Sequence, residues 1–154
     1  MMRRHEREIT DREEMEAIIQ RAQVCRIALS ENDEPYIVPV NFGYESNSLY
    51  FHCAAEGKKL DMIRLNGKVC FEMDIDHQIV KSAGRPCECS ARYRSVVGFG
   101  RAFVVDDLQE RSRALNVIIQ HYGSDRYDFS EKELERVHII KIEIHSMTGK
   151  KAGY

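Results

Sequence analysis

The sequence of 154 residues has no tryptophan, only three prolines and nine glycines, and it contains no repeat and no low-complexity tract. It also lacks any apolar run near the roughly 18 residues of a membrane-spanning helix, so we expect no membrane partner. Neither charge sign is in excess, because 23 Lys and Arg oppose 25 Asp and Glu, for a net charge of −2. Binding nucleic-acid phosphates needs a concentrated basic face, so this balance argues against a nucleic-acid partner.

The remaining composition is that of a globular protein, with 43% hydrophobic and 31% charged residues. This length suits one domain, residues 1–154, which should bury about 68–70% of its unfolded surface without metal or disulfide staples. The first eight residues lack the apolar core of a signal peptide. We therefore expect a cytoplasmic protein.

Cysteine usage agrees with that compartment, since five cysteines cannot close into a full disulfide set. Cys25, Cys53 and Cys70 lie in apolar runs, where cysteine behaves as a small hydrophobe. Cys87 and Cys89 have one residue between them, too tight for the usual zinc spacing. We expect no metal site, and the role of this late pair stays open.

Apolar periodicity predicts a mainly β chain with helical insertions. The predicted strands are at about 24–29, 35–44, 49–53, 69–75, 93–105 and 137–145. The predicted helices are 11–22, behind a Thr10–Glu13 capping box, 57–65, one from Asp106 or Asp107 to about 122, and one from Ser130. Residues 76–92 are expected to form a loop. Because hairpins join most strands, the pattern favours a six-stranded antiparallel barrel over a doubly wound parallel sheet.

Three residues interrupt the predicted strands. Pro39 cannot donate to a ladder, so a bulge or an unpaired edge is expected there. Gly98 and Gly100 weaken the fifth strand, which indicates a bend or a close approach by another group.

The strongest chemical signal is the pair Lys58 and Lys59 at a predicted helix start. Basic side chains there oppose the helix dipole, and they are favourable if a bound phosphate lies between them and the free amides. The alternative is that both lysines only solvate an exposed turn, and their spacing does not decide between the two interpretations. The spacing is not that of a Walker loop.

Three further residues each have a functional and a structural interpretation. Arg26 in an apolar strand either extends its head to water or faces a ligand anion. Asn41, beside Pro39, either lies in a turn or pairs with the edge of a flat heterocycle. His52 is a weak catalytic candidate, although a histidine at a strand end is more often structural.

The ordered motifs together resemble a known family. They are residues 26–29, 39–44, 50–59, 93–100 and 147–150. In this order and spacing they resemble the FMN-binding split barrels, the superfamily of pyridoxamine 5′-phosphate oxidase, and within it the nitroimidazole-resistance (Nim-like) branch. The chain lacks the arginine-rich C-terminal segment of the oxidases proper, so vitamin B6 oxidation is not expected.

The resemblance implies a six-stranded split barrel that forms a homodimer with FMN in clefts between the subunits. Residues matching Arg26, Lys58 and Lys59 would hold the phosphate, and those matching Val40, Asn41 and Phe42 would line the isoalloxazine. The residues matching Phe51, His52, Cys53 and Ala54 would contact the ribityl chain. Those matching Tyr93, Arg94 and Ser95 would approach from the partner subunit.

Two function classes follow. The first is an FMN-dependent oxidoreductase that reduces a small electrophile such as a nitroaromatic, with an electron donor left open because no nicotinamide fingerprint is present. The second is a module that binds flavin or haem without turnover. An oligonucleotide-binding barrel is disfavoured by the charge balance and the lack of a basic, aromatic-studded strand face.

Overall fold

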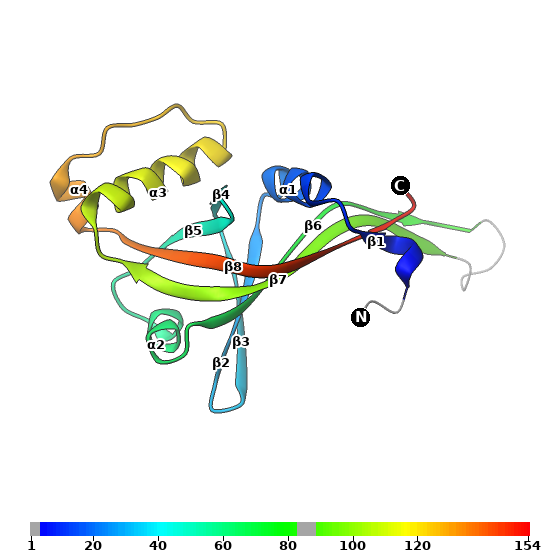
Figure 1. Cartoon of the computed structure of the whole chain (residues 1–154), viewed down its shortest axis with the longest axis horizontal. Helices are drawn as coiled ribbons and strands as arrows, with labels where there is room; N and C mark the ends of the chain where they lie inside the picture. The colour runs from blue at the N-terminus through cyan, green and yellow to red at the C-terminus, as the bar shows by residue number, and fades with distance from the viewer. Residues whose placement is uncertain (1–3, 83–88) are drawn as a thin grey trace.

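A computed structural model describes residues 4–82 and 89–154 of the chain as a strongly bent β-sheet with helices packed around it (Figure 1). In chain order the elements are a 3₁₀ turn His5–Arg7, β1 Glu8–Ile9, α1 Arg12–Arg21, β2 Cys25–Glu31, β3 Glu34–Val40, β4 Gly43–Glu45, β5 Ser48–Cys53, α2 Lys58–Leu65, β6 Lys68–Val80, β7 Ser90–Val105, α3 Leu108–His121, α4 Glu131–Glu135 and β8 His138–Ala152. Among these residues no helix has the length and apolar character needed to cross a bilayer.

The strands pair in the order β3-β2-β6-β7-β8-β5-β4, and β1 adds to β8. Every pairing is antiparallel. One hydrophobic core collects side chains from α1, α2 and most of the strands. The sheet therefore wraps around this core, and β3 and β4 are its end strands, each with one edge free of a strand partner. This is an antiparallel split barrel, as predicted.

The predicted count of six strands is wrong, because the described residues form eight. The two-residue β1 carries too short a signal to be found by periodicity. The predicted strand 35–44 is two strands: β3 pairs with β2 as far as Val40, and β4 pairs with β5 from Gly43 onward. The chain changes partners at Asn41 and Phe42. Pro39 lies in unbroken register on the end strand β3, so the unpaired-edge alternative holds and the bulge does not.

The predicted loop 76–92 is partly strand. β6 continues to Val80 and pairs with β7 from Ser90, and the register shifts between Ile75 and Gln78. Asp76 adopts a left-handed φ of 57° at this shift. A bulge moves the following side chains to the other face and breaks the period-two pattern, which is why the sequence signal ended there. Cys87 lies outside the described residues.

The helices begin close to the predicted positions. Asp11, not Thr10, caps α1, and its carboxylate accepts from the Glu13 amide at 3.0 Å. Asp107 caps α3, and Ser130 with Glu133 forms the capping box of α4. The last two helices cover the outer side of β5 and β8, where they form a second apolar cluster.

Both strand glycines allow a close approach. A Cβ on Gly98 would lie 2.1 Å from Cζ of Phe71, its register partner, so the Phe71 ring covers that backbone. A Cβ on Gly100 would lie 2.3 Å from the Glu143 carbonyl oxygen, at a register shift between β7 and β8. The prediction of a bend or a close approach is confirmed.

Candidate functional site

A pocket of about 200 Å³ lies where the β3 end of the split sheet meets α2. Its lining joins the chain around the start of α2 to one residue of β3: Tyr36, Cys53, Ala54, Glu56, Gly57, Lys58, Lys59 and Leu60. Four of the residues predicted to bind cofactor, Cys53, Ala54, Lys58 and Lys59, are thus together in one place. We call this the α2 pocket.

The N-terminus of α2 is open to a ligand. Gly57 is its N-cap residue, with φ 134°, and no side chain in the described part of the chain caps the first amides of the helix. Glycine tolerates this φ because it has no Cβ. Free amides and the helix dipole at such an end favour an anion, and a phosphate monoester has the right charge.

The two lysines differ in their surroundings. Lys58 Nζ donates to Glu34 Oε1 at 2.9 Å and lies 5.0 Å from the centroid of the Tyr36 ring. The hydrogen bond to Glu34 raises the pKa of Lys58. Lys59 is half-buried, its Nζ lies 5.3 Å from the centroid of the Phe51 ring, and no ion pair involves it within the described part of the chain. Lys59 is therefore the inner cation and Lys58 the outer one.

Cys53 is half-buried on the pocket wall. Burial raises the pKa of its thiol, and the charges of Lys59 and Arg64 oppose that rise only in part. Since thiolate is the reactive form, the thiol contributes packing here.

His52 points away from the α2 pocket. Side chains alternate along β5, so Phe51 and Cys53 face the barrel interior and His52 faces the opposite side, in register with Ile139. His52 is exposed and does not line the pocket. The structure does not bring this weak catalytic candidate to the phosphate residues.

Arg26 also lies outside the α2 pocket. Its Nη1 donates to Glu72 Oε2 at 3.0 Å and to Asp74 Oδ1 at 2.8 Å, on the outer face of the sheet. The Glu72 hydrogen bond raises the pKa of Arg26, and burial raises the pKa of Glu72 despite this arginine. Within one chain Arg26 is neutralised by these two acids of the adjacent strand β6.

The segment predicted to line the flavin ring has mixed exposure. Val40 and Phe42 are buried, whereas Asn41 between them is exposed at the change of strand partners. The Phe42 ring packs 4.4 Å from the His121 ring, centroid to centroid, and its amide donates to the Tyr122 hydroxyl at 3.0 Å. Asn41 is therefore the member of this segment whose side chain is open to a ligand.

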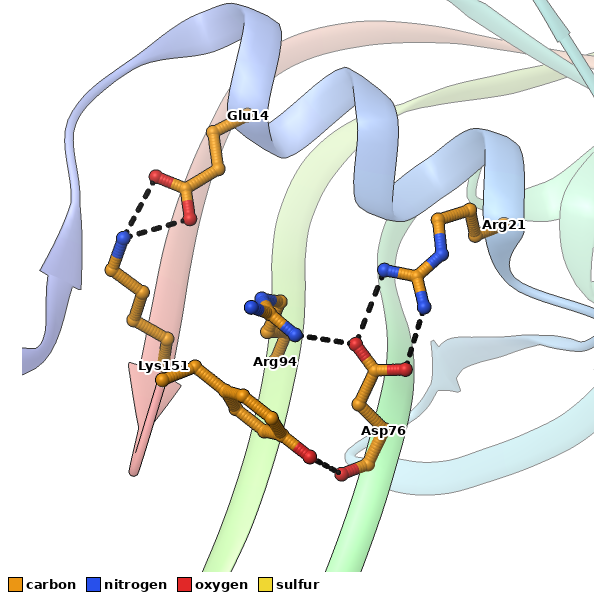
Figure 2. Close-up of polar contacts among 6 residues, drawn as sticks. Glu14, Arg21, Asp76, Arg94 and Lys151 are labelled. Atoms are coloured by element: carbon orange, nitrogen blue, oxygen red, sulfur yellow. Dashed lines mark hydrogen bonds and ion pairs between the residues drawn. The ribbon is translucent and has the colours of Figure 1, made fainter.

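The three residues expected to approach from a partner separate into two faces of β7. Tyr93 and Ser95 share the alternation of Phe99, which is 57% exposed on the outer face. Arg94 points the other way and donates to Asp76, as Figure 2 shows.

Sequence reasoning missed the cluster around Asp76. Arg21 from α1 and Arg94 from β7 both bind its carboxylate, and the Tyr154 hydroxyl donates to its backbone carbonyl at 2.9 Å (Figure 2). Nearby, Lys151 Nζ binds Glu14 at 2.8 and 3.0 Å. These partners are up to 137 residues apart in sequence, so only the alternation of acids at 72, 74 and 76 hinted at them.

No cluster of three or more metal-ligating side chains occurs among residues 4–82 and 89–154.

Comparison with known proteins agrees with this geometry. The family described as pyridoxamine 5′-phosphate oxidase matches residues 11–151. An uncharacterised protein of Rhizobium meliloti (strain 1021) is 32% identical over 65 residues, which span 42% of this chain and 42% of that protein.

Solved structures with the same fold include three informative ones. A candidate 5-nitroimidazole antibiotic resistance protein of Bacteroides thetaiotaomicron VPI-5482 is 33% identical, with a TM-score of 0.83 over 94% of this chain and 86% of that one. An FAD- and haem-binding protein of Mycobacterium smegmatis has a TM-score of 0.85 at 19% identity, covering 96% of this chain and 74% of its own. A flavocytochrome of Azotobacter vinelandii has a TM-score of 0.81 at 19% identity, covering 100% and 73%.

At 19% identity the last two show the fold alone. The family match extends over nearly the whole described barrel, including β2, β3, α2 and the long β7–β8 pair. This chain belongs to the pyridoxamine 5′-phosphate oxidase family of flavin-binding split barrels.

Proposed function

We propose that the protein binds FMN with its phosphate in the α2 pocket and acts as an oxidoreductase that reduces a small electrophile, such as a nitroaromatic. The observation that carries this proposal is the uncapped start of α2 beside Lys58 and Lys59. Free amides and two cations in one small pocket match the charge and size of a phosphate monoester.

The residues present fit the rest of such a cofactor. Asn41 is exposed directly after the end strand β3, where it and the free edge of that strand offer donors and acceptors to a heterocycle. The bound flavin would supply the redox chemistry, and the chain supplies binding and orientation. The similarity to a candidate nitroimidazole resistance protein supports a nitroaromatic as the first substrate to test.

We propose that the working form is a homodimer. A row in register crosses four strands on the outer face: Ile37, Ala28, Cys70 and Phe99. Ile37 is 62% and Phe99 57% exposed, an unusual amount of apolar side chain for an uncovered sheet face. Arg26 and Ser95 share this face, so a second copy seated on it would contact them.

A second candidate is a module that binds flavin or haem without turnover. The observation in its favour is that no histidine lines the α2 pocket among the described residues and that burial raises the pKa of its thiol, which makes the reactive thiolate harder to form.

The visible spectrum of the freshly purified protein tests the cofactor. Flavin bands support the proposal, a Soret band favours the haem module, and a colourless protein that takes up neither FMN nor haem contradicts both. Turnover is then tested with a reduced nicotinamide as donor and a nitroaromatic as acceptor. Bound flavin without nitroaromatic reduction would leave the binding module as the function.

A further inference from the structure

We infer that Glu34 is a specificity-determining residue that makes the α2 pocket selective for flavin mononucleotide over the dinucleotide. This inference rests on the proposed function, because it concerns which flavin phosphate the same pocket accepts. The two flavins differ beyond the first phosphate group. In the dinucleotide a second phosphate group is joined directly to the first.

The first step is the order of charges across the pocket. Lys59 is half-buried against the Phe51 ring, whereas the side chain of Lys58 is 50% exposed at the rim. The first phosphate has the helix amides and Lys59 available to it. Any group attached to that phosphate must extend outward, toward Lys58 and the solvent.

The second step is that the rim is acidic. Glu34 holds Lys58 at 2.9 Å, so the outer cation is already paired. Glu31 is the register partner of Glu34 across the β2–β3 hairpin, and its charge also acts on Lys58. Glu56 lies on the pocket wall. A second phosphate would therefore meet three carboxylates and one cation that is already bound.

The consequence is a difference between the ligands. One phosphate is compatible with the inner amides and Lys59, but a second phosphate has to displace Glu34 from Lys58 or lie beside its charge. An exposed ion pair changes an affinity by about 2–5-fold, and a like charge has a similar effect in the opposite direction. We expect the unmodified protein to bind FMN more tightly than FAD.

The test uses full-length protein freed of bound flavin, and the probes FMN, FAD and riboflavin. In Glu34→Gln we expect FAD affinity to rise about 5-fold and FMN affinity about 2-fold, with riboflavin unchanged. In Glu34→Lys the preference for FMN should fall at least about 10-fold, because a new cation faces the second phosphate. Added salt should reduce both effects.

The matched control is Asp33→Asn. Asp33 is an exposed acid on the same hairpin turn, with φ 64°, which asparagine tolerates. The Asp33→Asn substitution removes the same charge one residue away from Glu34 and should leave the FAD-to-FMN affinity ratio unchanged. Thermal unfolding checks that the Glu34→Gln and Glu34→Lys variants remain folded. We expect both to fold, because the side chain of Glu34 is exposed.

Three results would overturn the inference: an unmodified protein that prefers FAD, a ratio that Glu34→Gln and Glu34→Lys leave unchanged, or an equal change in Asp33→Asn. Failure of the proposed function looks different. If the proposed function is wrong, FMN and riboflavin bind equally, or neither binds. If only the inference about Glu34 is wrong, FMN still binds more tightly than riboflavin, but the FAD-to-FMN ratio does not change in the Glu34 variants.

Discussion

Arg94 Nη1 donates to Asp76 Oδ2 at 2.5 Å, and the same carboxylate accepts two hydrogen bonds from Arg21, at 3.1 and 2.6 Å (Figure 2). One aspartate thereby joins α1, β6 and β7. The Tyr154 ring centroid lies 4.0 Å from the Arg94 guanidinium, so the end of the chain also packs on this cluster. Asp76 itself has a left-handed backbone, with φ 57°, at the register shift between β6 and β7.

Asp76 should make stability depend on pH. The Arg21 hydrogen bonds, followed by that from Arg94, hold the pKa of Asp76 below its usual value. A carboxylate with a depressed folded-state pKa stabilises the protein above its unfolded pKa of about 3.9 and loses that contribution as pH falls through the lower folded value. We expect Asp76→Asn to lower the melting temperature at pH 7, with a difference that is complete above about pH 5 and disappears in stronger acid.

The measurement is thermal unfolding of both proteins from about pH 2 to pH 7, a range that extends below the unfolded pKa of an aspartate. Asp128→Asn is the control, because Asp128 is exposed in the segment between α3 and α4. A constant difference at every pH would show that Asp76 acts through its backbone and not through its charge.

The two lysines of the α2 pocket should distinguish phosphorylated from unphosphorylated flavin. Replacing both Lys58 and Lys59 with alanine should weaken FMN binding about 30-fold or more, because charge-assisted hydrogen bonds are lost. Riboflavin, which has no phosphate, should change by less than about 3-fold. The double variant Lys68→Ala/Lys132→Ala removes two exposed lysines elsewhere and should bind as the unmodified protein does. Equal losses for FMN and riboflavin would contradict the phosphate assignment.

His52→Ala should leave both FMN affinity and flavin reoxidation within about 2-fold of the unmodified protein. The reason is that β5 turns His52 to the face opposite the α2 pocket. Titration with FMN and stopped-flow reoxidation by a nitroaromatic provide the two measurements. A slowing of about 10²–10⁴-fold with normal FMN affinity would instead identify a general acid or base.

The proposed dimer should depend on the apolar row of the outer sheet face. We expect sedimentation of the unmodified protein to give twice the chain mass and Phe99→Asp to give the single mass, since an aspartate there would be buried against the partner without a counter-charge. Leu65→Asp is the control, because Leu65 is 72% exposed at the end of α2, away from that row. An unmodified monomer that retains FMN would rule out a site shared between subunits.

Local patterns in the sequence were sufficient for most of the fold. An apolar run located β5, period-two alternation located the first parts of β6 and β8, and capping residues located α3 and α4. These signals are local, because strand alternation and helix caps depend on neighbours a few residues away. Besides the two-residue β1, two predictions failed where the strand pairing changes within one predicted segment: at Asn41 the chain leaves β2 for β5, and at Asp76 the register of β6 with β7 shifts.

The candidate site likewise has a part that local sequence predicts and a part that depends on long-range pairing. The sequence by itself determined the phosphate-binding candidates Lys58 and Lys59, because adjacent residues at a helix start must share one location and one dipole. Only the tertiary structure decided which distant side chains join them. It placed Glu34 on Lys58, turned His52 to the opposite face and paired Arg26 with Glu72 and Asp74. These contacts depend on strand register and sheet curvature, which long-range pairing sets and which a window of neighbouring residues does not contain.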